Sequence, residues 1–258
     1  MDSSLSSELD ISGRGGEPAV DVEFDTRSDA PPGTDIDQTS QTLRRFHQLL
    51  WSKPLPSGHV FKLEQRGRSS YLIHESELGV FDLSSDFFAA WHRKLAPLWS
   101  QLPKAEFERQ ERLARSVGGY IVFPCRTVNR KQTINMRRAT HHRVGDRFDL
   151  ALECIRRHYK GEPSPLSDVL GRYQSFFNLF ESFDGYLDFF YLRDAVKPDG
   201  NLKFFWHFDD FASRPLPSTI DDYRVYRSNV LTFVAARNLR IRSSWAQRQL
   251  PTNHTEPG

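Results

Sequence analysis

Apolar residues recur at different spacings along this chain of 258 residues, and each spacing predicts a different kind of element. The first regular run follows Ser40, which is a typical helix N-cap. Its apolar positions recur at intervals of three and four residues: Leu43, Phe46, Leu49 and Leu50. We therefore predict a helix from residue 41, which must end before Pro54 because proline breaks a helix.

Short strand-like runs follow this helix. HVFKLEQ (59–65) and SSYLIHE (69–75) predict a hairpin that turns at Arg66-Gly67-Arg68, and LGVFDL (78–83) predicts a third strand. Ser85 or Asp86 is then expected to cap a helix. YIVFP (120–124) is typical of a buried strand, and we expect QTIN (132–135) to return beside it.

The remaining predicted elements are mostly helical. Charged helices are expected at 104–117 and 146–159, and Ser164-Pro165 begins another that runs to Asp184-Gly185. GYLDFFYLRDAV (185–196) and NLKFFWHF (201–208) flank a KPDG turn, which predicts a long β-hairpin. The last helix is capped by Thr219 and carries an apolar stripe: Tyr223, Tyr226, Val230, Phe233 and Arg237.

Strands and helices thus mix without a regular βαβ alternation, which predicts an α+β fold. We expect a single domain over residues 21–242, in which mixed antiparallel strands and hairpins pack with several helices. Residues 1–20 have almost no apolar side chains and predict a disordered acidic tail. Residues 243–258 predict a flexible C-terminal tail.

Charge is distributed unevenly, although the net charge is only +2. In the first forty residues ten acidic side chains face two arginines, which gives −8. The remainder has 33 basic against 23 acidic residues and carries +10. Such a basic body attracts phosphates, anionic surfaces or its own acidic tail, and ordinary solubility charge is the alternative interpretation. We interpret the acidic stretch that contains Asp35 and Asp37 as solvated, since it lacks the glycine and terminal glutamate of a calcium loop.

The stretch 132–159, QTINMRRATHHRVGDRFDLALECIRRHY, has the densest charge. On a helix of about 100° per residue, its second half has an apolar side: Phe148, Leu152, Ile155 and Tyr159. The opposite side carries charge: Asp146, Asp149, Glu153, Arg156 and Arg157. We expect Asp146 to be the N-cap. One interpretation of the charged side is a solvated face with weak ion pairs. The other is a reactive or phosphate-binding surface.

The first half of this stretch has no such structural explanation, because its clustered cations repel one another. We therefore predict that Asn135 to Arg143 lines a cleft. Asn135, Arg138, Arg147, Arg156, Arg157 and Lys53 are the candidate substrate-binding residues. Asp146, Asp149 and Glu153 are the candidate catalytic carboxylates. His141 and His142 do not have the spacing of a zinc site, so no metal ligands are predicted.

Several segments carry a family resemblance: GGYIVFP, TIN, DRFDLALECIRRHYKGEPSPL, GYLDFFYLRD and FVAARNLRI. They resemble an uncharacterised bacterial family, a domain of unknown function, over residues 22–241. The resemblance implies one domain that includes the acidic stretch from Asp21, and it supplies no activity. The family pattern reads Thr-Ile-Asn, two variable positions, then Arg-Gly. Asn135 and Arg138 match it, whereas Ala139 replaces the glycine.

Two functional hypotheses remain open. The first is an enzyme that acts on a phosphate-bearing substrate such as a nucleotide or nucleic acid. The second is a non-catalytic binding or regulatory protein with a basic surface. The sequence identifies no cofactor and no oligomeric state. No run reaches the roughly 18 apolar residues of a membrane span, and the N-terminus does not have the pattern of a secretory signal. We therefore expect a cytoplasmic protein without a membrane partner.

Cys125 and Cys154 lie in apolar segments without a Cys-x-x-Cys pattern, so both thiols are expected to be free. The melting temperature should therefore be the same with and without a reductant, as measured by thermal denaturation. A large loss of stability on reduction would show that the two cysteines form a disulfide.

Overall fold

The fold is a four-stranded antiparallel sheet packed with helices, and it is described here from a computed structural model. The structure describes residues 19–67, 71–89 and 93–249. The sheet order is β1-β2-β3-β4. The strands are β1 (Glu64–Gln65), β2 (Leu72–Ser76), β3 (Gly79–Phe87) and β4 (Tyr120–Pro124). The α+β prediction is therefore confirmed.

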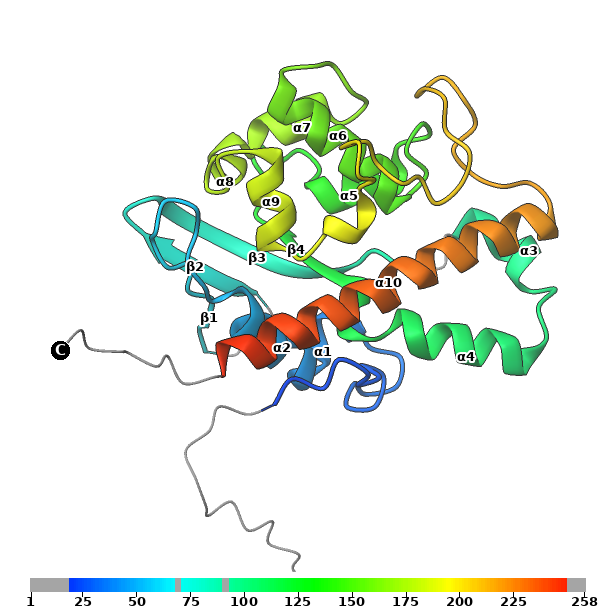
Figure 1. Ribbon diagram of the computed structural model, residues 1–258, viewed down its shortest axis with the longest axis horizontal. Coiled ribbons are helices and arrows are strands. Elements are labelled where there is room, and N and C mark those ends of the chain that lie inside the picture. The colour runs from blue at the N-terminus through cyan, green and yellow to red at the C-terminus, as the bar shows by residue number, and fades with distance from the viewer. Residues whose placement is uncertain (1–18, 68–70, 90–92, 250–258) are drawn as a thin grey trace, which may run out of the picture.

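Helices surround this sheet in chain order (Figure 1). The first are α1 (Ile36–Thr39), α2 (Gln41–Trp51), the short 3₁₀ turn η1 (Arg93–Leu95), α3 (Ala96–Trp99) and α4 (Lys104–Ala114). After η2 (Val117–Gly119) and β4 come α5 (Ile134–Thr140), α6 (Phe148–Lys160), α7 (Ser167–Arg172), α8 (Gln174–Asn178) and α9 (Phe183–Phe189). The turn η3 (Arg193–Ala195) and the long helix α10 (Ile220–Arg248) complete the described chain. In Figure 1, α5 to α9 gather above β3 and β4, while α1, α2 and α4 lie below.

Several predicted elements form as expected. The Ser40 hydroxyl accepts the Leu43 N–H and caps α2, and Thr219 caps α10 in the same way. The hairpin of β1 and β2 pairs Glu64 with Ile73 and Gln65 with Leu72. Arg68, in its predicted turn, lies outside the described residues.

Two predictions about strands and caps near the sheet are wrong. Ser85 and Asp86 do not cap a helix, because β3 continues to Phe87 and pairs along its whole second half with β4. Residues 132–135 do not return as a strand. Instead, the Thr133 hydroxyl accepts the Met136 N–H and starts α5.

Two further predictions fail because short apolar runs fit a helix and a strand equally well. The helix expected from Ser164 to Asp184 is broken into α7 and α8, and α9 begins at Phe183. The expected hairpin on either side of KPDG contains α9, and only the bridge between Val196 and Leu202 remains of it. The segment of α9 forms a helix instead of a strand because the rings of Tyr186, Phe189 and Phe190 then pack together in one aromatic cluster.

The ends of two helices also differ from the prediction. The N-cap of α6 is Arg147, and Asp146 precedes it with a left-handed φ of 60°. Helix α10 continues to Arg248, beyond the predicted domain end at residue 242, and its Trp245 is buried.

Helix α10 is held against the sheet by a close approach to η2. A Cβ on Gly118 would lie 2.4 Å from Asn238 Oδ1, so only glycine allows this contact. Asn238 Oδ1 instead accepts the Gly118 N–H at 2.8 Å. Next to it, the wholly buried Arg237 donates to the carbonyls of Gly118 (2.9 Å), Tyr120 (2.6 Å) and Phe190 (2.9 Å).

Replacing Arg237 with methionine should lower the free energy of unfolding by about 3 kcal/mol or more, because three buried carbonyls lose their donor. Urea denaturation measures this change. The matched control is Arg240→Met on the same helix, which removes a half-exposed ion pair with Asp194 and should cost less than about 1 kcal/mol. Equal costs in the two variants would contradict a special role for Arg237.

Candidate functional site

A cavity of about 340 Å³ opens where α1, β3 and the N-terminus of α5 meet, and we call it the carboxylate pocket. Most of its lining residues are polar, with three aspartates among hydroxyl and amide side chains. The lining residues are Asp35, Asp37, Gln38, Tyr71, Ser84, Ser85, Asp86, Cys125, Thr127, Thr133, Asn135 and Met136.

Asp37 is enclosed in this pocket, with 18% of its side chain exposed. Its Oδ2 accepts the Phe87 N–H at 2.8 Å, and Oδ1 lies 3.8 Å from Arg115 Nη1. Burial raises the pKa of Asp37 to about 6; the charge of Asp35 adds to the rise, and the contacts with Phe87 and Arg115 oppose it. The interpretation of Asp37 as part of a solvated segment is therefore wrong.

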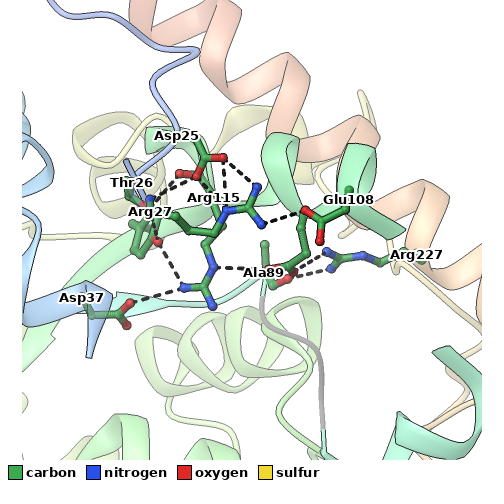
Figure 2. A network of polar contacts seen from close by, with 10 residues as sticks. Asp25, Thr26, Arg27, Asp37, Ala89, Glu108, Arg115 and Arg227 are labelled. Atoms are coloured by element: carbon green, nitrogen blue, oxygen red, sulfur yellow. Dashed lines mark hydrogen bonds and ion pairs between the residues drawn. The ribbon is translucent and has the colours of Figure 1, made fainter. Parts of the chain in front are cut away.

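A polar network holds Arg115 beside Asp37 (Figure 2). Arg115 donates to the Tyr120 hydroxyl at 3.3 Å and pairs with Glu111 at 3.5 Å. The Tyr120 hydroxyl also contacts Thr26 Oγ1 at 2.7 Å, so the acidic N-terminal segment is tied to α4 and β4. The position of Asp37 thus depends on contacts between segments that are far apart in the chain.

Asp86, on β3, is 3% exposed. Its only side-chain hydrogen bonds among the described residues are two long ones of 3.4 Å from Ser84 Oγ. No cation of the described chain lies within ion-pair distance of it. Burial raises the pKa of Asp86 well above its usual range, while the positive charge of Arg138 opposes the rise and Asp37 adds to it. Burial therefore favours the protonated form of Asp86.

The Ser85 hydroxyl is oriented by a hydrogen-bonded chain from α2. Trp51 Nε1–H donates to His47 Nδ1 at 2.9 Å, so the remaining proton of the neutral imidazole lies on Nε2. That Nε2 is 2.8 Å from Ser85 Oγ and donates to it. Burial lowers the pKa of His47 to about 3, and Arg237 adds to this effect. His47 thus fixes Ser85 without being available as a base for it.

Asn135 and Arg138, two of the predicted substrate-binding residues, lie together at this pocket. Asn135 lines it, and its Oδ1 accepts Arg138 Nη2–H at 2.7 Å, which leaves the amide NH₂ group for the pocket. Arg138 is buried behind Asn135, and its Nη1 lies 2.8 Å from Asp146 Oδ1 and 3.1 Å from the Asp146 carbonyl oxygen. Asp146 therefore acts as the counter-ion of Arg138.

Arg147 and Asp149 lie inside the protein, where they leave no surface for a substrate. The Arg147 guanidinium forms a two-point ion pair with Asp149 and donates to the carbonyls of Trp206, His207 and Pro215. Asp149 Oδ2 also accepts the Phe205 N–H at 2.7 Å. This pair fastens the segment 205–215 to the start of α6.

Glu153 forms ion pairs with two arginines of the same helix, Arg156 and Arg157. Glu153 accepts from Arg156 Nε at 2.7 Å and from Arg157 Nε at 2.8 Å. Burial favours protonation of Glu153, but the hydrogen bonds from both arginines prevail and lower its pKa. The three side chains line a cavity of about 360 Å³ together with Lys197. The charged side of α6 is thus largely covered, not solvated.

Lys53 lies among aromatic rings and belongs neither to the carboxylate pocket nor to the cavity lined by Glu153. Its Nζ is 3.8 Å from the ring centre of Tyr191, 4.6 Å from Phe189 and 5.6 Å from Trp51. Burial lowers the pKa of Lys53 to about 7, whereas the ring faces favour the charged amine. The nine candidate residues therefore do not converge on one pocket.

The two ends of the stretch 135–143 line different cavities. Asn135 belongs to the carboxylate pocket. His141, His142 and Arg143 line a cavity of about 380 Å³ together with Arg157, Ser164 and Phe211, which we call the basic pocket. Among the described residues no group of three or more His, Cys, Asp or Glu side chains is arranged to hold a metal ion.

The sequence profile of DUF6994, a family of unknown function, matches residues 20–241. The chain belongs to this family, which confirms the resemblance to a domain of unknown function, and the match includes the acidic stretch from Asp21. Comparisons with curated proteins and with solved structures gave no match. None of the described helices is long and apolar enough to cross a membrane.

Sequence reasoning missed Asp37 and Asp86. Asp86 alternates with Asp82 and Ser84 on the face of β3 opposite to Leu83 and Phe87, and such a polar face normally indicates solvent. Helix α1 packs against β3, and residues at the start of α5 line the same pocket as Asp86. The sequence signal was weak, because Asp35 and Asp37 lie at the start of α1 whereas Asp86 lies on β3, about fifty residues later.

The Asp37→Asn variant should differ from the wild type in how stability depends on pH. The raised pKa means that folded Asp37 binds its proton more tightly than unfolded Asp37 does. The contribution of protonated Asp37 to the free energy of unfolding is therefore fully present below pH about 4, and it is lost as the pH rises through about 6. Relative to the variant, the wild-type free energy of unfolding should fall by up to about 3 kcal/mol between pH 4 and pH 7.

Urea denaturation at several pH values measures this difference. The control Asp221→Asn removes a carboxylate whose side chain is 89% exposed, and it should not reproduce the effect. Parallel stability curves for the wild type and Asp37→Asn would show that Asp37 titrates as an ordinary solvated carboxyl group.

Proposed function

We propose that the protein is an enzyme whose carboxylate pocket performs general acid–base chemistry. The observation that carries this proposal is Asp86, a buried carboxyl group without a cationic partner among the described residues and with only long hydrogen bonds. Burying such a group costs stability, and packing alone gives no reason to keep it. Strongly perturbed carboxyl groups in a cleft are typical of catalytic sites.

The surroundings of Asp86 and Asp37 favour different roles for the two carboxyl groups. Burial favours the protonated form of Asp86, which serves as the acid, while Asp37, with a pKa of about 6, is mostly ionised at pH 7 and serves as the base. Two carboxyl groups with different pKa values in one pocket supply both proton transfers of a hydrolysis.

The lining favours an uncharged polyhydroxylated substrate. Hydroxyl and amide groups of Thr127, Thr133 and Asn135 can donate to and accept from sugar hydroxyls, whereas the carboxylates of Asp35 and Asp37 repel a phosphate placed in this pocket. We therefore propose hydrolysis of a glycosidic bond. Asp86 donates its proton to the leaving oxygen, water attacks the anomeric carbon, and Asp37 takes a proton from that water.

Other features fit the same proposal. Asn135 presents its amide group to the pocket. Burial raises the pKa of both Asp37 and Asp86, and the positive charge of Arg138, which lies behind Asn135, opposes this rise. The free thiols of Cys125 and Cys154 fit a reducing compartment, so we propose the cytosol as the location.

The Asp86→Asn variant should be more stable than the wild type at pH 7, by roughly 1 kcal/mol, because the folded state no longer holds an acid that ionises freely when unfolded. It should also lose turnover by about 10²-fold or more, since the proton donor is gone. Urea denaturation and a panel of p-nitrophenyl glycosides measure the two effects.

The control Asp82→Asn changes a carboxylate on the same face of β3 that pairs with Arg126 outside the pocket, and it should keep full turnover. The proposal fails if the wild type hydrolyses no glycoside of the panel. It also fails if Asp86→Asn keeps its turnover or is strongly destabilised, because Asp86 would then have a structural role.

A further inference from the structure

The basic pocket lies at the opposite end of α5 from the carboxylate pocket. Helix α5 has seven residues, so about 10 Å of helix separates its two ends. The side chains that line the basic pocket come from the turn after α5, from the C-terminal half of α6, and from the segments around residues 164 and 211. Among these described lining residues there is no carboxylate.

Two arginines, Arg143 and Arg157, line this pocket. Arg157 shares the carboxylate of Glu153 with Arg156, and Glu162 also interacts with Arg156. Arg143 is exposed, and no ion pair of its side chain occurs among the described residues. A cluster of this kind gains stability when an anion neutralises it.

Arg157 is held in one orientation towards the pocket. Its Nε donates to Glu153 at 2.8 Å, its Nη1 donates to the Pro163 carbonyl at 3.3 Å, and its guanidinium lies 4.9 Å from the ring centre of Phe211. These contacts leave Nη2 unused among the described residues, and 28% of the side chain is exposed. A guanidinium fixed in this way binds an oxyanion with little loss of conformational entropy.

His141 adds an oriented donor. Its Nδ1 accepts the Arg143 N–H at 3.2 Å, so in the neutral ring the proton lies on Nε2. The rings of His141 and His142 are stacked, with centres 4.9 Å apart and planes inclined by 13°. Burial lowers the pKa of His141, and the positive charges of Arg137, His142 and Arg143 lower it further. A bound anion offsets that repulsion.

We propose that the basic pocket binds the phosphoryl group of a small phosphate-bearing molecule. Arg157 on α6 and His141 and Arg143 in the turn after α5 offer several donors from two chain segments, which suits the several oxygens of a tetrahedral anion better than a planar carboxylate. The cavity is the size of a small-ligand site. The site is separate from the acid–base chemistry proposed for the carboxylate pocket.

Calorimetric titration of the full chain tests this site without any turnover. The probes are inorganic phosphate, glycerol 3-phosphate and glycerol. Both phosphate probes should bind and glycerol should not. Tighter binding of glycerol 3-phosphate than of inorganic phosphate would identify a phosphate monoester as the ligand, and the reverse order would identify the free ion.

The Arg143→Ala variant should weaken binding of the better phosphate probe about tenfold, because it removes a charged side chain that forms no ion pair with the described residues. Its melting temperature should stay the same, since Arg143 is exposed. The matched control is Lys160→Ala, which removes an exposed positive charge from α6 outside the pocket and should weaken binding less than twofold.

Three outcomes overturn the proposal. The first is no binding of either phosphate at millimolar concentration. The second is equal weakening by Arg143→Ala and Lys160→Ala, which indicates a diffuse electrostatic effect. The third is tighter binding of an oligonucleotide than of both phosphates, with a steep salt dependence, which indicates a nucleic-acid surface instead.

Discussion

The buried guanidinium of Arg237 is the constraint on which the rest of this fold depends. It joins α10 to the carbonyls of Gly118 and Tyr120, at the start of β4, and to the carbonyl of Phe190, at the end of α9. Because a buried cation cannot give up these acceptors without a large cost, the three segments keep one mutual arrangement. Tyr120, which begins β4, is also the residue whose hydroxyl anchors Thr26 of the N-terminal segment. The carboxylate pocket is assembled on this frame.

Many charged residues of this protein form ion pairs and hydrogen bonds that hold distant segments of the chain together. Arg147 and Asp149 attach the segment 205–215 to α6, Arg138 and Asp146 fix the turn before α6, and Arg115 holds Asp37. Asp86 is the contrast, because it is buried without any such partner among the described residues. The ion pairs explain why the other carboxylates are buried, whereas they do not explain the burial of Asp86, which is the reason for the proposed catalytic role.

The two proposed sites follow from the position of α5 between β4 and α6. Its N-terminal end brings Asn135 to the carboxylate pocket, and the turn after it brings His141 and Arg143 to the basic pocket. One short helix therefore separates an acidic environment from a basic one. An uncharged polyol fits the first, whose carboxylates repel anions, and an anion fits the second, whose arginines attract it.

The sequence by itself determined the α+β class, the caps at Ser40 and Thr219 and the buried strand 120–124, because these depend on local periodicity and local hydrogen bonds. It also predicted that the segment from Asn135 to Arg143 lines a cleft; in the structure Asn135 and Arg143 line two different cavities. Only the tertiary structure decided between helix and strand at α9, where apolar runs suit both until their packing partners are known. The tertiary structure likewise determined that Asp86 is buried, because α1 packs against β3, on whose polar face Asp86 lies. Burial, and with it the chemistry of a carboxyl group, is a property of contacts between distant segments.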